Sequence, residues 1–287
     1  WFFTYPLGKK RVIFEREQSD WRFGSTVSSR QTAVLEELTR DNALFLSLAS
    51  RVHLAEAMPM YLWFQHSLAF ALPGKTTIDP EELDDWLDEA PIRRRQLTAL
   101  LRAADLGITD IRVEDPVAES EVPRIQVVRP ELSFLHGPQA IALGLHDQSH
   151  GTRAWLNLLF AALKALEGGT TLFVDEVDSS LHPRLTARLV ELFKSPETNN
   201  SQAQLVFTTH DPTLLGSSFG QDILDRDEIW FVDKDSGGAT TLYPLTDFHP
   251  RKEESTQRRY LGGSYGAVPN VSEYEFRRAV LDDSEVA

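Results

Sequence analysis

The sequence of 287 residues contains no cysteine, which excludes a disulfide framework, a thiolate metal site and a cysteine nucleophile. It has no apolar run of about 18 residues that could span a membrane. It also shows no signal-peptide pattern, so it is expected to be cytoplasmic. Positive charge is scarce, because 29 Lys and Arg residues face 43 Asp and Glu residues and leave a net charge of −14. That balance argues against a broad nucleic-acid-binding face, since phosphate neutralisation drives such binding. The local basic groups at residues 93–95, 251–252 and 258–259 are typical of solvated helix faces.

The most informative segment that is present is TTLFVDEVD at residues 170–178, where an apolar run leads into three carboxylates. The run predicts a buried strand of a parallel sheet, and open α/β sheets bind ligands beyond the carboxyl ends of their strands. Adjacent acids there need something to offset the desolvation of their charge, and a hydrated magnesium ion can do so. Asp175 would hold the metal, and Glu176 could orient or deprotonate an attacking water. The alternative is a surface loop in which these acids are simply solvated.

A second apolar strand is predicted at residues 204–209, and it ends at His210. Between the two strands, Pro183 at a first helical position and an apolar stripe predict a helix packed on the sheet; the stripe consists of Leu181, Leu185, Leu189 and Phe193. A lone histidine after a strand is more often structural than catalytic. Here the two neighbouring strand ends would bring His210 to Asp175 and Glu176, which favours a functional role.

Upstream, the segment DQSHGTR at residues 147–153 precedes a helical pattern with an apolar face made of Trp155, Leu159, Leu163 and Leu166. A small, glycine-containing segment before a helix exposes free N–H groups and the positive end of the helix dipole. Ser149 and Gly151 could therefore form an anion site. The same residues also fit an ordinary capped helix start.

The rest of the chain predicts a mixed α/β protein. A hairpin is expected at residues 1–5 and 11–15, and a mainly helical region at 30–104. Short strands are expected at residues 108–113, 124–128, 132–135 and 140–145. A further hairpin at residues 228–232 and 240–245 would turn at DSGG, and residues 282–287 would form a loose acidic tail.

The order of the motifs resembles the distal half of an ABC-superfamily ATPase. Asp175 and Glu176 end a segment similar to a Walker B motif, and His210 is similar to the switch histidine. The segment similar to the signature loop comprises Ser149, His150, Gly151 and Thr152, and the one similar to the D-loop comprises Ser179, Ser180, Leu181 and His182.

Residues 37–47, 104–111 and 260–269 extend the resemblance to the SMC/RecF/OLD-like branch, and within it to stand-alone AAA-family ATPases of bacterial abortive-infection loci. The resemblance implies an α/β P-loop NTPase head. A parallel sheet flanked by helices would form its distal lobe, joined by an inserted helical subdomain and antiparallel strands.

By this resemblance the cofactors are ATP and Mg²⁺. Asp175 would support the metal, Glu176 would be the general base and His210 would sense the γ-phosphate. The remaining nucleotide-binding set would complete a site across a head-to-tail dimer: Ser149, His150, Gly151, Thr152, Asp178, Ser179, Ser180 and His182. Three of these, His150, Thr152 and His182, differ from the residues usual in transporter-type ATPases, which weakens a transporter assignment more than it weakens ATP binding.

The phosphate-cradling loop of this superfamily, GxxxxGK[ST], is missing. Its one candidate, residues 69–77, has Ala69 in place of the first glycine and is interpreted as a loop between helices that does not follow an apolar strand. We expect the motif before Trp1, and no Q-loop glutamine can be assigned. The chain by itself is therefore expected to bind ATP weakly or not at all.

The resulting prediction divides the chain into four parts. Residues 1–24 end an N-terminal β-rich ATPase lobe, and residues 25–107 form the helical insertion. Residues 108–250 form the ATPase lobe with the four motifs, and residues 251–287 form a C-terminal tail.

The predicted function is magnesium-dependent ATP hydrolysis by a head that dimerises on ATP binding in an anti-phage defence system. Its partners would be a second copy of itself and a nuclease-like or RloB-type effector. A RecF/SMC-like ATPase of DNA repair is one alternative, and a non-catalytic dimerisation fragment is another. A third is a metal-dependent nuclease that uses Asp175, Glu176, Asp178 and His210 on phosphodiesters.

Overall fold

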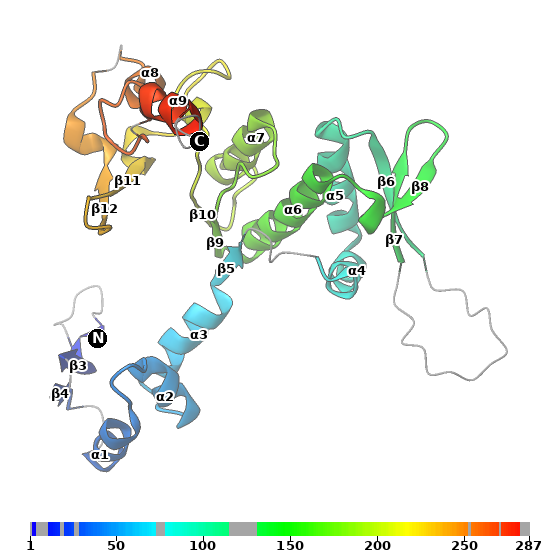
Figure 1. The fold of residues 1–287 in the computed structure, drawn as a ribbon. Coiled ribbons are helices and arrows are strands. Elements are labelled where there is room, and N and C mark those ends of the chain that lie inside the picture. The colour runs from blue at the N-terminus through cyan, green and yellow to red at the C-terminus, as the bar shows by residue number, and fades with distance from the viewer. Residues whose placement is uncertain are drawn as a thin grey trace, which may run out of the picture.

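The computed structural model describes residues 2–3, 11–17, 20–25, 29–72, 78–114, 131–251, 254–269 and 271–281. Figure 1 shows how its helices and strands are arranged. The predicted strand at residues 124–128 and the acidic tail at residues 282–287 lie outside these ranges. So do residues 73–77 of the loop considered above as a phosphate-binding candidate.

A three-stranded parallel sheet lies at the centre, with β5 (Leu68–Ala71), β9 (Thr171–Val174) and β10 (Gln204–Phe207) in the order β10-β9-β5. Leu172 pairs with Leu205 on one side and with Ala69 on the other. The predicted parallel sheet is thereby confirmed. The sequence does not predict β5, and the expectation that no strand precedes the loop after Leu72 is wrong. The predicted helical insertion at residues 25–107 therefore includes a strand of the central sheet, while the division into domains stays a prediction.

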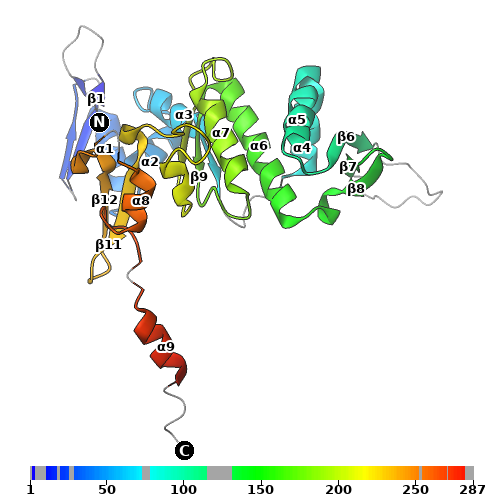
Figure 2. The ribbon, with the colours of Figure 1, turned by 90° about the horizontal axis from the view of Figure 1, so that it is seen from above.

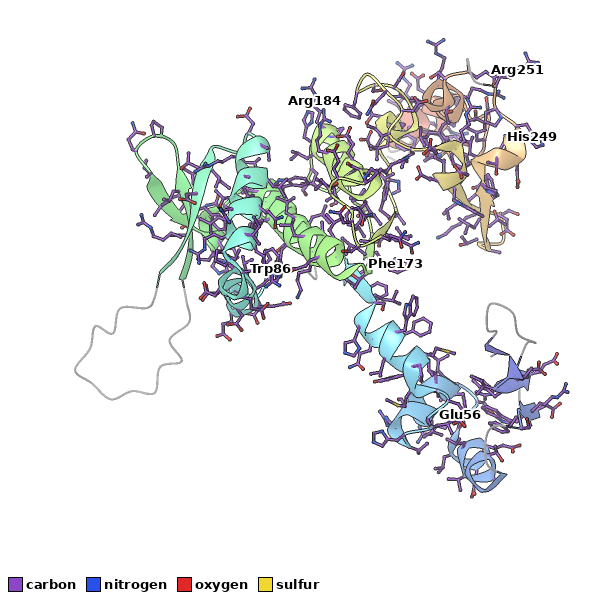
Figure 3. The ribbon with its side chains drawn as sticks, turned by 180° about the vertical axis from the view of Figure 1, so that it is seen from behind. Glu56, Trp86, Phe173, Arg184, His249 and Arg251 are labelled. Atoms are coloured by element: carbon purple, nitrogen blue, oxygen red, sulfur yellow. The ribbon has the colours of Figure 1, made fainter. Side chains whose placement is uncertain are left out.

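Two helices cover one face of this sheet, α6 (His150–Gly168) and α7 (Pro183–Lys194). Leu172 and Val174 point into their apolar core and are 0% and 6% exposed. The opposite face is more open, because Phe173 is only half-buried and stacks on Phe70, which is 60% exposed. Figure 3 shows Phe173 where β9 meets the segment that carries α3 and β5. The strand expected to be buried is thus buried on one face.

The ends of α6 and α7 follow from local chemistry. The Ser149 side chain accepts a hydrogen bond from the Thr152 amide and caps α6, which ends at Gly169 in the left-handed conformation (φ 64°). An added Cβ at Gly169 would meet the Ser201 carbonyl oxygen at 2.5 Å, so only glycine fits there without a shift. Pro183 starts α7, as the sequence predicts.

A second layer packs on the far side of α6. It contains α4 (Pro80–Glu89), α5 (Pro91–Ala103) and the antiparallel sheet of β6 (Ile108–Glu114), β7 (Glu131–His136) and β8 (Ile141–Gly144). These strands confirm three of the four short strands predicted between residues 108 and 145. Fully buried side chains of Leu83, Leu97, Leu101 and Phe134 join this layer to the core of α6.

The N-terminal part has its own small core. Its elements are β1 (Phe2–Phe3), β2 (Arg11–Val12), β3 (Phe14–Glu17), β4 (Asp20–Phe23), α1 (Ser29–Leu38), α2 (Phe45–Arg51) and α3 (Met58–His66). Phe14, Phe45 and Leu35 are buried together, and Trp21 packs against them. The antiparallel pairing of β1 with β2 confirms the predicted first hairpin.

The C-terminal part follows β10. It contains the hairpin of β11 (Trp230–Lys234) and β12 (Thr240–Pro244), α8 (Thr256–Leu261), α9 (Glu273–Leu281), and three 3-10 turns at Pro212–Leu215, Arg226–Glu228 and Leu245–Phe248. The hairpin turns at residues 235–238 as predicted, with the Asp235 side chain accepting from the Gly237 and Ala239 amides. Figure 2 shows α9 extending away from the rest.

Candidate functional site

Residues that follow β9 and β10 gather at one edge of the central sheet. Phe207 pairs with Val174, so Thr208 and Asp175 are the next residues of the two neighbouring strands. The Thr208 amide donates to the Val174 carbonyl at 3.0 Å, and the Asp175 amide donates to Ala71 of β5 at 3.1 Å. Both side chains are exposed to solvent at this edge. The register thus places them at the edge where open α/β sheets bind ligands.

Glu176 and His210 meet at the same edge. Their closest side-chain atoms, Glu176 Oε1 and His210 Nε2, are 4.0 Å apart, and the side chains are 49% and 84% exposed. Glu176 has a φ of 50°, in the left-handed region that residues other than glycine seldom adopt. The predicted proximity of Asp175, Glu176 and His210 is therefore observed, whereas their roles remain predictions.

Two threonines that the sequence analysis leaves without a role connect these residues. Thr208 Oγ1 donates to Asp175 Oδ1 at 2.6 Å and accepts from the Glu176 amide at 2.8 Å. Thr209 Oγ1 donates to Asp178 Oδ1 at 2.6 Å. Both threonines could be found from the sequence, because they end a strand that is predicted to lie beside the strand leading into Asp175.

Asp178 has a structural task in this arrangement. Its Oδ1 accepts from Thr209 Oγ1 and, at 3.2 Å, from the His210 amide, so it holds the loop that carries His210. Within the described ranges, no cluster of three or more His, Asp or Glu side chains is arranged to hold a metal ion. This geometry gives no support to a nuclease that would bind its metal ions through Asp175, Glu176, Asp178 and His210 together.

Asp175 nevertheless fits a magnesium ion that is bound together with a nucleotide. Mg²⁺ in such sites keeps several waters and takes one or two carboxylates together with substrate phosphates. Asp175 is exposed, and Thr208 Oγ1 donates to its Oδ1 at 2.6 Å. Its carboxylate would therefore hold the ion at this edge of the sheet.

The segment around Ser149 begins α6. Besides the Thr152 amide at 3.1 Å, the Ser149 hydroxyl contacts Thr152 Oγ1 at 2.8 Å. The capped helix start considered for this segment is thus present, and the anion site remains a prediction that is compatible with it. Ser149 and His150 are exposed, while Thr152 is 8% exposed.

The segment of residues 179–182 lies directly against the start of α6. An added Cβ at Gly151 would be 2.9 Å from the Ser180 carbonyl oxygen, so the two backbones approach as closely as glycine allows. Ser180 has a φ of 64°, and His182 Nδ1 accepts from the Arg184 amide at 3.2 Å and caps α7. Ser179, Ser180 and His182 are exposed. The two predicted interface segments therefore form one continuous surface.

Three arginines of the basic groups named from the sequence, Arg93, Arg94 and Arg259, pair with acids of the same chain. Arg93 contacts Glu167 at 2.8 Å and Glu89 at 2.5 Å. The hydrogen bond with Glu167 makes the larger contribution, and together the two bonds raise the pKa of Arg93. Arg259 pairs with Glu254, whose pKa this hydrogen bond lowers. Such pairing favours a structural role over nucleic-acid binding. Among the described helices, none combines the length and the apolar character that crossing a membrane requires.

Comparisons with known proteins place these features in context. The sequence model of a family described as "AAA domain, putative AbiEii toxin, Type IV TA system" matches residues 1–216. One similar solved structure is described as "Structural biochemistry of ATP-driven dimerization and DNA stimulated activation of SMC ATPases". It shares 14% sequence identity at a TM-score of 0.37, and the match covers 59% of this chain and 98% of that chain. No curated protein matches the chain.

Proposed function

Since the family match spans 216 of its 287 residues, the chain belongs to this AAA-domain family, and we propose that it is an ABC-type ATPase that hydrolyses ATP with Mg²⁺. The observation that carries the proposal is the meeting of Asp175, Glu176 and His210 at the carboxyl edge of β9 and β10. This edge is where parallel α/β sheets bind nucleotides.

Each side chain at this edge has a proposed task. Asp175 would hold Mg²⁺, which supplies charge neutralisation for the transferred phosphoryl group. Glu176 would orient the attacking water and accept its proton. Its carboxylate is half-exposed and can therefore contact a water at this edge. His210 would contact the γ-phosphate, since its imidazole lies beside Glu176 and is largely open to solvent.

A second copy of the chain would complete the site. The exposed residues Ser149, His150, Ser179 and Ser180 form one surface with the positive end of a helix of 19 residues. That surface is suited to the γ-phosphate of a nucleotide bound by the other copy. ATP binding would then draw two heads together, and hydrolysis would release them.

The biological setting is part of the same proposal. The family description names a toxin–antitoxin system, and we place this ATPase in a cytoplasmic anti-phage defence system. In that setting the ATP-driven dimer would act as a switch on a separate effector protein.

Substitution of Glu176 tests the function in the intact protein. Glu176→Gln keeps the shape and removes the base, so turnover is expected to fall by a factor of about 100 or more while ATP binding persists. The variant should accumulate as an ATP-bound dimer in size-exclusion chromatography with light scattering. Glu197→Gln is the matched control, because Glu197 is exposed and lies in the connection from α7 into β10, before the strand and not at the edge beyond it.

Unchanged ATP turnover in Glu176→Gln would overturn the assignment. Cleavage of DNA without ATP, abolished by Asp175→Ala, would instead support the nuclease alternative. A wild-type protein that binds ATP without hydrolysing it would leave only a dimerisation role.

A further inference from the structure

Thr208 makes four hydrogen bonds around the turn that carries the predicted metal ligand and general base. Its hydroxyl donates to Asp175 Oδ1 at 2.6 Å and accepts from the Glu176 amide at 2.8 Å. Its main chain donates to Val174 at 3.0 Å and accepts from the Val177 amide at 3.0 Å. Thr208, the residue that directly follows β10, thus bonds to each of the four consecutive residues 174–177.

The turn needs such support because Glu176 is in the left-handed conformation. A residue other than glycine persists there only where its surroundings determine the backbone, and such residues gather at functional sites. Thr208 binds the amide of Glu176 through its hydroxyl and the following amide, that of Val177, through its carbonyl. The left-handed residue is therefore held on both sides by the same partner.

The sheet register explains why this partner is a threonine at position 208. Because Phe207 pairs with Val174, the next residue of β10 lies opposite the first residue after β9. Side chains alternate between faces along a strand, so a hydroxyl one position earlier would point away. A β-branched hydroxyl residue fits the extended backbone and can both donate and accept.

We propose that Thr208 is a positioning residue that sets the direction of the Asp175 carboxylate and the backbone of Glu176. The inference rests on the proposed function. Thr208 acts through these two residues, so it governs how the base and the metal ligand face bound nucleotide. Its loss is therefore expected to lower kcat and to leave the KM for ATP nearly unchanged.

The experiment compares three variants of the intact protein with the wild type. Thr208→Val has the same shape and lacks the hydroxyl, whereas Thr208→Ser keeps it. Thr186→Val is the matched control, because the buried Thr186 hydroxyl has no hydrogen-bond partner among the residues that the structure describes. ATP turnover gives kcat and KM, thermal unfolding gives stability, and amide hydrogen exchange monitors Glu176 and Val177.

For Thr208→Val we expect kcat to fall about ten- to hundredfold with KM changed less than about threefold. The Glu176 amide should exchange faster while the Val177 amide, bonded to the Thr208 carbonyl, keeps its protection. Thr208→Ser should restore turnover to within about threefold of wild type, and Thr186→Val should match wild type.

Turnover of Thr208→Val within twofold of wild type would overturn the inference. The ATPase assignment is tested separately, by Glu176→Gln. Unchanged exchange of the Glu176 amide would overturn the inference as well, even in a protein that does not hydrolyse ATP. Equal losses in Thr208→Val and Thr208→Ser would also count against it, because they would assign the effect to packing.

Discussion

Gly151→Ala tests the contact between the start of α6 and residues 179–182. In an ordinary helix this change stabilises the fold by about 0.5–1 kcal/mol, because glycine loses more backbone entropy on folding. Here the new Cβ would lie 2.9 Å from the Ser180 carbonyl oxygen, whereas ordinary contacts begin at 3.4 Å. The two backbones must therefore separate by about half an ångström, and overpacking of this kind costs about 1–3 kcal/mol.

The clash should outweigh the helix gain, because the obstructing atom belongs to the backbone of a residue already at a φ of 64°. We expect the free energy of unfolding to fall by about 1 kcal/mol, measured by urea denaturation. Gly168→Ala is the matched control at the last position of the same helix, where the nearest atom is the Thr170 methyl carbon at 3.3 Å. A methyl group can yield, so this control should stay within about 0.5 kcal/mol of wild type.

The reasoning is refuted if Gly151→Ala proves as stable as Gly168→Ala or more stable. That result would mean that residues 179–182 move away from α6 at little cost. It would also remove the argument that the two predicted interface segments form one surface.

Further predictions concern a second glycine at a close contact and the ion pairs of α7. Gly169→Ala combines a positive φ with a Cβ 2.5 Å from the Ser201 carbonyl oxygen, so it should lower the free energy of unfolding by about 2 kcal/mol in thermal melts; unchanged stability would contradict the close approach. For Lys194, burial lowers the pKa, but hydrogen bonds with Asp225 and Glu228 outweigh it and raise the pKa above its ordinary 10.5. The stabilisation from a raised pKa is complete below the ordinary value and is lost as pH rises through the folded-state value. The free energy of unfolding of each protein is therefore to be measured from pH 8 upward and compared with its own value at pH 8. Wild type should begin to lose stability at a lower pH than Lys194→Met, which has no amine to deprotonate.

Much of the site could be predicted because its signals are local. The apolar runs before Asp175 and His210 predict strands wherever they occur, and both strands end within three residues of the predicted position. Ser149 and Pro183 predict helix starts for equally local reasons, a side-chain cap and a fixed φ. The parallel sheet then follows, since two consecutive strands joined by a helix usually lie side by side, as β9 and β10 do.

The rest depends on contacts between distant residues. Only Ser67 separates the end of α3 from the four residues of β5. Their strand conformation comes from pairing with β9, about a hundred positions later in the sequence. Nothing within so short a segment separates it from a continuing helix. The contacts of Thr208 depend likewise on the register of β10 against β9, which a single sequence does not specify.

Helix α7 links the segment of residues 179–182 to the C-terminal part of the molecule. It starts at the exposed cap of His182 and ends at Lys194, whose ammonium group binds Asp225 and Glu228 at 2.7 Å in the C-terminal part. A helix of 12 residues is about 18 Å long. The helix thus has the predicted dimer interface at one end and, at the other, the acidic residues that lead into β11.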